Sequence, residues 1–397
     1  MDSMWLMYLL FAGFSIPLWL TFFSILLSLS YACVLLWVYS NNRTGLHSSL
    51  TANKGCSTAG PDFPGISVII PVRNEANHLP ALLGDIARLR YSGEFEVLFV
   101  DDHSTDHSAL IIADCPLKQV TCLPLPDGLE GKKAALDYAI RRCSYSLIVC
   151  TDGDVRLPSG WLAKIGDSFC SGQWDFCAFP VFVQQGSSPM AHFQWMEYLG
   201  MAGVTRAGIV SSTFFLANGA NMAFTRAGYE MVDGFSGNEH LASGDDVFLV
   251  NKFATIPNLK VAHSVEPAVL TEPVKRISEL FRQRMRWGGK NAQHTSFVFK
   301  MLIWLTGLAN VFILITALAL PWIEGYRRWM ITGIIIKLIA DYAYLRGLAK
   351  IFNQAWPGLY PFVVGWLVNT LYITFVAPWI FFIPSTTWKN RRVKTHC

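Results

Sequence analysis

Residues 66–75 read ISVIIPVRNE, a short β-branched run that ends in a polar cluster. The same form recurs in EVLFVDD at residues 96–102 and in SLIVCTDGD at residues 146–154. Helix-forming stretches lie between these runs, at Leu79–Leu89 and at Lys132–Arg142. Strands that alternate with helices predict an α/β domain with a mostly parallel sheet and helices on both faces.

The polar clusters at the ends of these strands predict a ligand site. Pro71–Glu75, Asp101–Asp102 and Asp152–Asp154 each follow a predicted strand. Ligands of parallel sheets bind at the carboxyl ends of the strands. We therefore expect the three clusters to meet at one edge of the sheet.

The triplet Asp152-Gly153-Asp154 has the composition of a cation site. Gly153 allows the backbone to turn sharply close to a ligand. Carboxylate oxygens suit Mg²⁺ or Mn²⁺, and such a cation neutralises a nucleoside diphosphate that leaves a sugar. D-x-D matches are also common in loops, so a solvated turn before a helix near Pro158 is the alternative.

A second acidic pair, Asp245 and Asp246, opens the apolar stretch VFLVNKF. Transfer to a hydroxyl needs a base, and two adjacent carboxylates raise one another's pKa. The alternative is that this pair caps a helix N-terminus.

Gln283, Arg286 and Trp287 share one face of the predicted helix Val274–Gly288, because they are spaced i, i+3 and i+4. Arg grips phosphate oxygens in a bidentate manner, and Trp offers a flat surface to a sugar. A cationic amphipathic helix on anionic lipid is the other interpretation, and the two are compatible.

The composition is that of a membrane protein. Hydrophobic residues make up 52% of the 397 residues. The net charge of +4 is too small to indicate a nucleic-acid-binding protein. Trp5–Val38 is almost wholly apolar and too long for one simple span, so we expect a break at Pro17 and a span over Leu18–Val38. The nine cysteines form no CxxC motif, which favours free thiols in a reducing compartment over zinc ligands.

The C-terminal part holds further apolar runs, near Val298–Trp322, Trp329–Leu348 and Tyr360–Pro384, each long enough to span a bilayer. The positive-inside rule places the central domain in the cytoplasm. It also places the basic tail after residue 388 there, although three spans would put that tail outside. Either one run is re-entrant or interfacial, or the charge rule fails here.

Lys337 and Asp341 lie four residues apart inside the second of these runs, so they share a helix face. Because an isolated charge in lipid is expensive, they are expected to pair or to face the protein interior. A structural ion pair and a lining for the acceptor path are both open.

The four signatures VDD, DGD, GDD and QRMRW, in this order, resemble glycosyltransferase family 2. The resemblance is to its membrane-integrated members, which include cellulose, chitin and hyaluronan synthases and ceramide glucosyltransferase. It covers about Gly65–Lys290 and implies a GT-A nucleotide-diphospho-sugar transferase fold with flanking transmembrane helices.

The resemblance also implies roles for individual residues. Asp246 corresponds to the catalytic base, with Asp245 in place of the usual Glu, and Asp154 to the metal ligand, with Asp152 beside it. The residues matching donor or nucleotide contacts are Pro71, Arg73, Asn74, Glu75, Asp102, Lys132, Asp152, Gln283 and Arg286. Those expected at the acceptor are Trp287, Asn218, Asn221 and Glu197, although a buried amide network is equally compatible with the last three.

The expected organisation is a membrane segment (1–40), a linker (41–64), a GT-A domain with a C-terminal interfacial helix (65–290), a transmembrane region (291–388) and a basic tail (389–397). The expected function is inverting sugar transfer from a nucleoside diphosphate sugar, with a UDP-sugar favoured, to a lipid or lipid-linked glycan. The partners are thus the donor, the acceptor and the membrane, without nucleic acid. A processive polysaccharide synthase, an inactive scaffold and a transporter-like protein are the alternatives.

Overall fold

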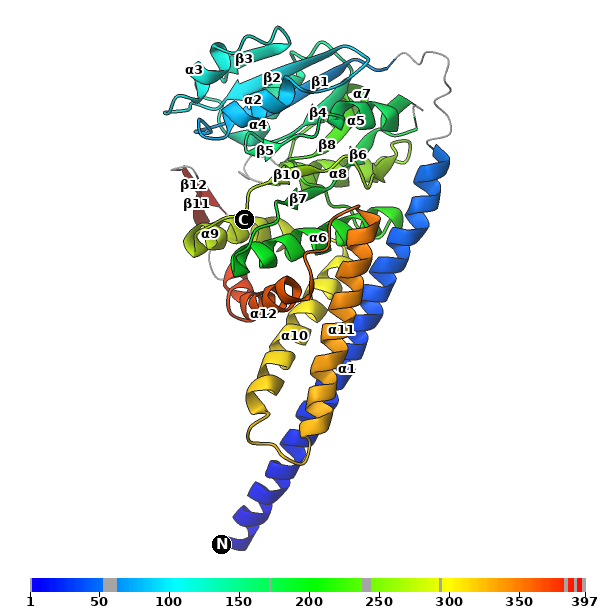
Figure 1. Cartoon of the computed structure of the whole chain (residues 1–397), viewed down its shortest axis with the longest axis vertical. Helices are drawn as coiled ribbons and strands as arrows, with labels where there is room; N and C mark the ends of the chain where they lie inside the picture. Colours follow the sequence, from blue (N-terminus) through cyan, green and yellow to red (C-terminus); the bar gives the residue numbers. More distant parts are fainter. Residues whose placement is uncertain are drawn as a thin grey trace.

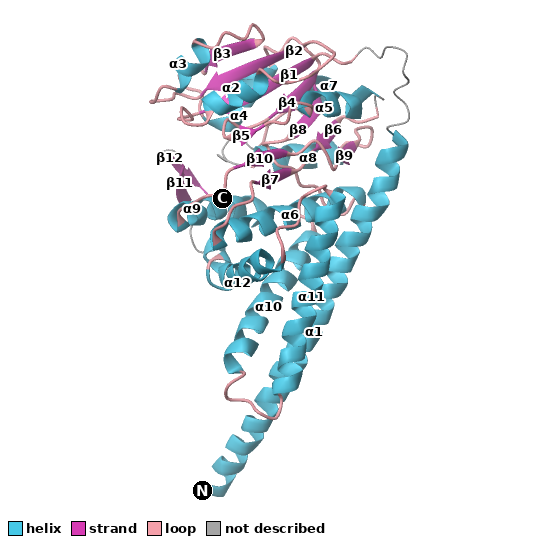
Figure 2. Cartoon of the chain, viewed as in Figure 1, coloured by secondary structure: helices cyan, strands magenta, loops and turns pink. Residues whose placement is uncertain are grey.

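The protein was analysed as a computed structural model, which describes residues 2–52, 63–170, 173–237, 244–292, 295–381, 385–388 and 391–394. An α/β domain lies at one end, and long helices extend away from it (Figure 1). The strands gather in that domain, apart from a short hairpin near the C-terminus (Figure 2). The α/β domain and the long helices are therefore separate parts of the molecule.

The domain is built on a sheet in the order β3-β2-β1-β4-β8-β6-β9, in which only β8 runs against the others. The predicted mostly parallel sheet is thus confirmed. Its strands are β1 Ile66–Val72, β2 Phe95–Asp101, β3 Val120–Pro124, β4 Leu147–Cys150, β6 Phe176–Ala178, β8 Met222–Thr225 and β9 Val261–His263. A smaller sheet, β5-β10-β7, consists of β5 Val155–Arg156, β10 Val269–Thr271 and β7 Val181–Val183.

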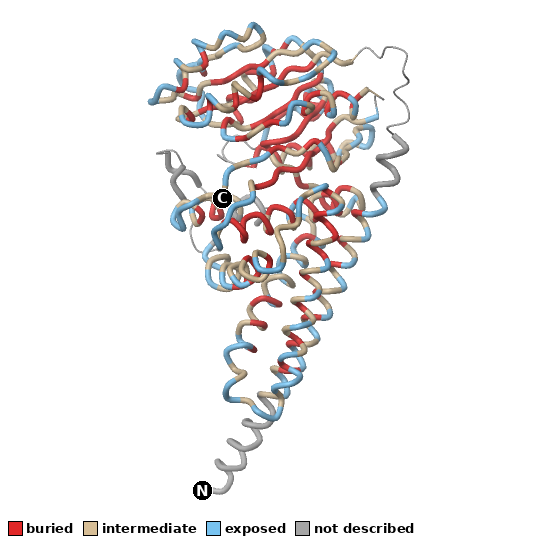
Figure 3. Tube along the Cα trace, viewed as in Figure 1, coloured by how far each residue is buried: buried red, intermediate tan, exposed pale blue. Residues whose placement is uncertain are grey.

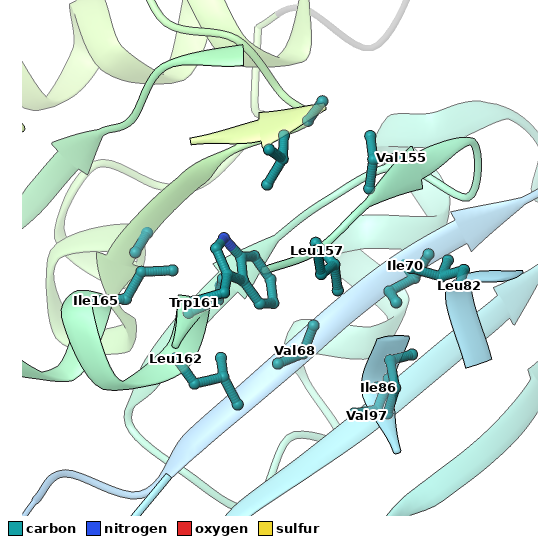
Figure 4. Packing of buried hydrophobic residues seen from close by; sticks show 14 of the residues in the cluster. Val68, Ile70, Leu82, Ile86, Val97, Val155, Leu157, Trp161, Leu162 and Ile165 are labelled. Atoms are coloured by element: carbon teal, nitrogen blue, oxygen red, sulfur yellow. The ribbon is translucent and has the colours of Figure 1, made fainter. Parts of the chain in front are cut away.

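Helices cover both faces of the large sheet because its central strands are apolar on both sides. Val68 and Ile70 of β1 face the cluster that holds Trp161 (Figure 4), whereas Ile69 between them faces the opposite cluster. The helices of the domain are α2 Leu79–Ile86, α3 Ser108–Ala113, α4 Gly131–Ile140, α5 Trp161–Cys170, α7 Arg226–Met231, α8 Asp245–Thr255 and α9 Ile277–Ala292.

One further helix, α6 (Pro189–Val210), lies between the sheets and the long helices (Figure 1). Ser188 caps it through a hydrogen bond from the Ala191 N–H, and Pro189 stands in its first turn, where a missing N–H costs nothing. The side of α6 that faces the long helices bonds to them directly. Tyr344 Oη donates to the Gly200 carbonyl oxygen at 3.1 Å, and Asn42 Nδ2 donates to that of Gly203 at 2.9 Å.

The N-terminal helix α1 runs without interruption from Asp2 to Ala52, with Pro17 inside it. The predicted break at Pro17 was wrong, because a proline removes only one backbone donor and membrane helices tolerate this. The predicted linker was also wrong over 41–52, where α1 continues. Asn42 there is fully buried, and its Nδ2 donates to the Val38 carbonyl oxygen of α1 as well as to that of Gly203. Residues 53–62 of that linker lie outside the described residues.

The remaining helices are α10 (Phe297–Ala319), α11 (Arg327–Ile351) and α12 (Leu359–Phe375), followed by the turn η1 (Ala377–Phe381) and the hairpin of β11 (Ser385–Trp388) and β12 (Arg391–Lys394). Three described segments are long and apolar enough to cross a membrane: Pro17–Thr44, Phe297–Ala319 and Leu359–Trp379. The outward sides of α1, α10 and α11 are largely exposed (Figure 3), as expected for surfaces that face lipid.

The arrangement of these helices does not follow their hydropathy. The less apolar α11 packs along α1, whereas α12 packs against α6 and α10. Lys337 and Asp341 of α11 are buried and paired, with Nζ 2.7 Å from Oδ2. Tyr31 and Trp366 also donate to the Asp341 carboxylate, each at 2.8 Å. These contacts favour the structural interpretation of the pair, which joins α1, α11 and α12.

Candidate active site

A pocket of about 320 Å³ opens between the strand ends of the domain and α6. Its walls come from segments far apart in the sequence. They are the loops after β1, β2 and β4, the first turns of α4 and α8, the segment before β8, and the inward faces of α6 and α9. The edge of the sheet that the sequence singled out is therefore one wall of this pocket.

The end of β2 is fixed to its neighbours by hydrogen bonds. The Asp102 N–H donates to the Val72 carbonyl oxygen, and the Gly131 N–H donates to Asp102 Oδ2 at 3.2 Å. Arg73 Nη1 donates to the Asp102 carbonyl oxygen and lies 4.0 Å from its carboxylate. Gly131 has a φ of +88°, a conformation that favours glycine. Asp102, which is 3% exposed, is therefore held at the bottom of the pocket.

Lys132 joins two of the acidic motifs. Its Nζ lies 2.6 Å from Asp152 Oδ1 and 3.3 Å from Asp245 Oδ2. Burial by itself would lower the pKa of Lys132, but Asp152 and Asp245 outweigh burial and raise that pKa. The ammonium therefore stays charged and holds together carboxylates that lie 93 positions apart in the sequence.

Asp246 is oriented by backbone donors. Its Oδ2 accepts from the Gly219 N–H at 3.1 Å, and its Oδ1 accepts from the N–H of Val247, in the first turn of α8, at 2.8 Å. The N-cap of α8 is Gly244, so neither aspartate is the capping residue, although both lie in the first turn. The Asp246 side chain also lines the pocket. Gly219 fits closely, because a Cβ at this position would lie 2.7 Å from both Asp245 Oδ2 and Lys132 Nζ.

The two aspartates of the DGD motif fit a divalent cation whose remaining ligands would come from the donor phosphates and water. Asp152 and Asp154 both line the pocket. Among the described residues, no group of three His, Cys, Asp or Glu side chains is placed to hold a metal ion. Mg²⁺ sites in nucleotide enzymes commonly use one or two carboxylates and complete the shell with substrate phosphates and water. Asp154, with Asp152 beside it, would hold such a cation.

Helix α9 contributes Gln283, Arg286 and Trp287 to the pocket. Burial lowers the pKa of Arg286, and Asp152 and Asp154 partly offset this effect. Arg284, on the side of α9 turned towards α6, is 2% exposed and forms an ion pair with Glu197 of α6 through two nitrogens. Its guanidinium lies 4.2 Å from the centroid of the Trp287 ring, and Trp287 packs edge-on against Tyr198.

Most of the residues predicted for the site line this one pocket. They are Pro71, Arg73, Glu75, Asp102, Lys132, Asp152, Asp154, Glu197, Asn218, Asp245, Asp246, Gln283, Arg286 and Trp287. Asn74 and Asn221 do not. The Asn74 side chain accepts from the Thr105 N–H and orders the loop. Asn221 is fully buried, accepts from Trp161 Nε1 and donates to the carbonyl oxygens of Pro180 and Pro267. For Asn221 the buried amide network is the interpretation that fits.

The sequence analysis missed one wall of the pocket. Tyr198, Met201, Ala202 and Thr205 of α6 line it together with His263 of β9. Their i, i+3, i+4, i+7 spacing is visible in the sequence, but it is the same spacing that a core-facing helix shows. Arg284 was also missed, because its partner Glu197 lies 87 positions away in the sequence.

The matches by sequence cover part of the chain. A family model described as glycosyl transferase family 2 matches residues 67–230. A pre-mycofactocin glycosyltransferase of Mycobacterium tuberculosis is 27% identical over 197 residues, which are 48% of this chain and 39% of that protein. An undecaprenyl-phosphate 4-deoxy-4-formamido-L-arabinose transferase of Aeromonas hydrophila is 29% identical over 28% of this chain and 35% of that protein. The chain thus spans about two fifths, 39%, of the length of the first of these relatives.

Among solved structures, the mannosyltransferase PcManGT from Pyrobaculum calidifontis in complex with GDP-Man and Mn²⁺ is similar, with a TM-score of 0.49 and 18% identity over 91% of this chain and 95% of that one. The matched segment 67–230 begins in β1 and includes six of the seven strands of the large sheet, as expected for a GT-A-like domain. Residues 67–230 of this chain are a glycosyl transferase family 2 domain.

Proposed function

We propose that this protein is a membrane-bound inverting glycosyltransferase that moves a sugar from a nucleoside diphosphate sugar, with a UDP-sugar as the first candidate, to a hydroxyl of a lipid or lipid-linked acceptor. The observation that carries the proposal is the meeting of Asp102, the Asp152/Asp154 pair and the Asp245/Asp246 pair in one pocket. These carboxylates come from three segments of the chain, and the first two of these segments belong to the family 2 domain.

The donor would lie along the strand ends, with its nucleotide near Arg73 and Asp102. Arg286 and Lys132 supply positive charge for the diphosphate, and a divalent cation held at Asp154 would add to it when bound. Asp246 takes the proton of the acceptor hydroxyl. The hydroxyl oxygen forms a bond to the anomeric carbon as the bond from that carbon to the diphosphate breaks, which inverts the configuration in a single displacement.

The membrane helices support transfer to a lipid over the processive synthesis of a polymer. A growing polysaccharide needs a path through the bilayer, whereas the described helices pack directly on one another. A Cβ on Gly333 of α11 would lie 2.6 Å from Ser24 Oγ of α1, and Gly347 of α11 packs in the same way on Tyr39. The buried Lys337–Asp341 pair fills the space between α1, α11 and α12.

The test uses the full chain purified in detergent with Mg²⁺ or Mn²⁺, a lipid extract, and UDP-glucose, UDP-N-acetylglucosamine or GDP-mannose. We expect one donor to release its nucleoside diphosphate and label the lipid. Asp246→Asn and Asp154→Asn should each lower this rate about 10²-fold or more. Asp114→Asn, an exposed carboxylate outside the pocket, is the matched control. Wild-type turnover in Asp246→Asn removes the base assignment, and the absence of release from every donor removes the proposal.

A further inference from the structure

Lys132 has two carboxylate partners, and they differ in how far solvent and ligands can reach them. Its Nζ lies 2.6 Å from Asp152 Oδ1 and 3.3 Å from Asp245 Oδ2. The Asp152 side chain is 36% exposed, whereas that of Asp245 is 5% exposed. The ammonium therefore makes one contact at the surface of the pocket and one contact with a buried carboxylate.

The backbone of Lys132 is fixed to the wall of the pocket. Lys132 lies in the first turn of α4, and the N–H of the preceding Gly131 donates to Asp102 Oδ2 at 3.2 Å. The turn before β8 approaches the ammonium closely, because a Cβ on Gly219 would lie 2.7 Å from Lys132 Nζ. An exchange of partners by Lys132 therefore involves the end of its side chain, which is 20% exposed and lines the pocket.

Asp152 is also one of the two carboxylates that would hold a divalent cation. Within the part of the chain that the structure describes, no third His, Cys, Asp or Glu side chain completes a metal-binding group with Asp152 and Asp154. A cation held by one or two carboxylates takes its other ligands from phosphates and water. Asp152 Oδ1 already accepts a hydrogen bond from Lys132, and two cations at one carboxylate repel each other. Lys132 therefore opposes the binding of a divalent cation by the protein alone.

We infer that Lys132 takes the place of the divalent cation at Asp152 until the donor binds, so that the protein binds the cation tightly only together with a nucleoside diphosphate. This inference rests on the proposed function. When Lys132 gives up Asp152 it stays paired with Asp245, so no buried charge is left without compensation. The phosphates of the donor bring the negative charge and the oxygen ligands that allow a second cation beside the ammonium.

The first experiment measures the binding of Mn²⁺ to the wild type without turnover. The full chain in detergent is titrated with Mn²⁺ alone, with uridine, and with UDP or GDP, and free Mn²⁺ is followed by electron paramagnetic resonance. The complex of Mn²⁺ with the nucleotide is measured without protein and subtracted. We expect uridine to leave the Mn²⁺ affinity unchanged and the nucleoside diphosphate to raise it about tenfold or more. An equal Mn²⁺ affinity with and without the diphosphate overturns the inference.

The second experiment removes the ammonium. Lys132→Met should bind Mn²⁺ alone about tenfold more tightly than the wild type, because the repulsion is gone, and should bind UDP alone more weakly, because a positive charge is lost. A general loss of structure would weaken both ligands, so these opposite shifts identify the exchange. Lys132→Arg keeps the charge and should keep the weak Mn²⁺ binding. Lys164→Met, which breaks an ion pair with Glu266 outside the pocket, is the matched control and should bind both ligands like the wild type. If folded Lys132→Met binds Mn²⁺ no more tightly than the wild type, the inference is wrong.

Nucleotide binding to the wild type separates this inference from the proposed function. UDP and GDP binding are measured by calorimetry with and without Mn²⁺. If neither nucleoside diphosphate binds to the wild type under either condition, the proposed function fails. If one of them binds and Mn²⁺ binds equally well without it, the proposed function stands and only the exchange at Lys132 fails.

Discussion

Gly219 is the residue that allows the two acidic motifs and Lys132 to meet. Because an added Cβ would lie 2.7 Å from both Lys132 Nζ and Asp245 Oδ2, Gly219→Ala must push these groups apart. A displacement of this size in a catalytic site costs about 10²-fold in rate. We expect such a loss in nucleoside diphosphate release, with little change in melting temperature.

Gly160→Ala is the matched control for this substitution, since a Cβ there meets nothing within 4 Å. It should retain the wild-type rate and melting temperature. Wild-type turnover in Gly219→Ala would mean that the bridge between Lys132 and Asp245 has no part in the reaction.

His78 gives the domain a pH-dependent contact beside the pocket. Its Nδ1 lies 2.8 Å from Glu75 Oε2, and this hydrogen bond raises the pKa of His78 from its model-peptide value of 6.5, with further contributions from Asp154 and Glu272. A raised pKa in the folded state stabilises the fold below the unfolded pKa, and that stability is lost as the pH rises through the folded pKa.

We therefore expect the melting temperature of the wild type to exceed that of His78→Asn most below about pH 6.5, and the difference to disappear at higher pH. Thermal unfolding followed from pH 5 to pH 9 measures this. His107→Asn, at an exposed histidine that ends the loop before α3, should show no such pH-dependent difference. A gap that widens with rising pH would reverse the assignment.

Asn218 and Asn221 show that residue type alone does not predict which side chain faces the ligand. Asn218 and Asn221 both belong to NGANMAF and carry the same chemistry. The turn before β8 places Asn218 in the pocket, whereas Asn221 is directed into the core, where its amide binds two carbonyl oxygens. Which amide faces the ligand depends on how the turn joins the buried strand, and this is set by tertiary packing rather than by residue type.

At the scale of the elements, the contact between α6 and α9 positions the cationic motif. Breaking a buried ion pair costs about 3–5 kcal/mol when one charge stays behind, and Glu197→Gln leaves Arg284, at 2% exposed, without its carboxylate. We expect lower thermal stability, weaker donor binding and a lower turnover number, because Gln283 and Trp287 lose their support.

Glu279→Gln is the control for this pair, because its partner Arg276 is 3.8 Å away and both side chains are exposed. It should change stability very little. If Glu197→Gln lowers stability but leaves both donor affinity and turnover unchanged, the pair is structural and does not position the motif.

The elements themselves were largely readable from the sequence, because their signals are local. The apolar runs expected to begin at residues 66 and 96 form β1 (Ile66–Val72) and β2 (Phe95–Asp101). Apolar runs next to polar strand ends supply that signal. Helix α6 was not placed at the site, because the spacing of its pocket-lining residues is the same as that of any helix face that packs against a core. The pairing of Arg284 with Glu197 spans 87 positions, and no local pattern encodes it.

At the scale of the whole molecule, one carboxylate fixes the membrane helices to one another. Asp341 of α11 accepts from Lys337, Tyr31 of α1 and Trp366 of α12. Asp341→Asn leaves the buried Lys337 ammonium unpaired, at a cost of about 3–5 kcal/mol. We expect a large fall in melting temperature in detergent, partly restored when Lys337→Met is added. Lys350→Met, at an exposed position of α11, should have little effect.

If the double variant Lys337→Met/Asp341→Asn is as unstable as the sum of its single variants, the two residues do not act as a pair. The spacing of Lys337 and Asp341 predicts that they share one face of a helix, but it does not predict which side chains that face contacts. Tyr31 precedes Asp341 by 310 positions, and Trp366 follows it by 25 positions. Only the assembled bundle shows that the pair is satisfied.

The packing of α12 favours one answer to the conflict between charge and topology. Helix α12 itself has 17 residues, which span about 25 Å, and it reaches the 21 residues of the candidate span Leu359–Trp379 only together with η1. It stays beneath α6 while α10 and α11 extend away from the domain alongside α1 (Figure 1). Leu359, Tyr360 and Leu367 on its outer side are exposed, as suits a helix lying at the bilayer surface. We therefore expect α1, α10 and α11 to cross the membrane and α12 to lie in its plane.

This topology returns the C-terminal tail to the side of the catalytic domain, where the hairpin of β11 and β12 already packs near α9. In a background without the other cysteines, we expect a membrane-impermeant maleimide to label Cys397 and Lys118→Cys, on the domain, from the same side. Glu324→Cys, in the exposed loop between α10 and α11, should be labelled only from the opposite side. The positive-inside rule then assigns the side of the domain to the cytoplasm. If Cys397 reacts together with Glu324→Cys, α12 is a full span, and the basic tail violates the charge rule.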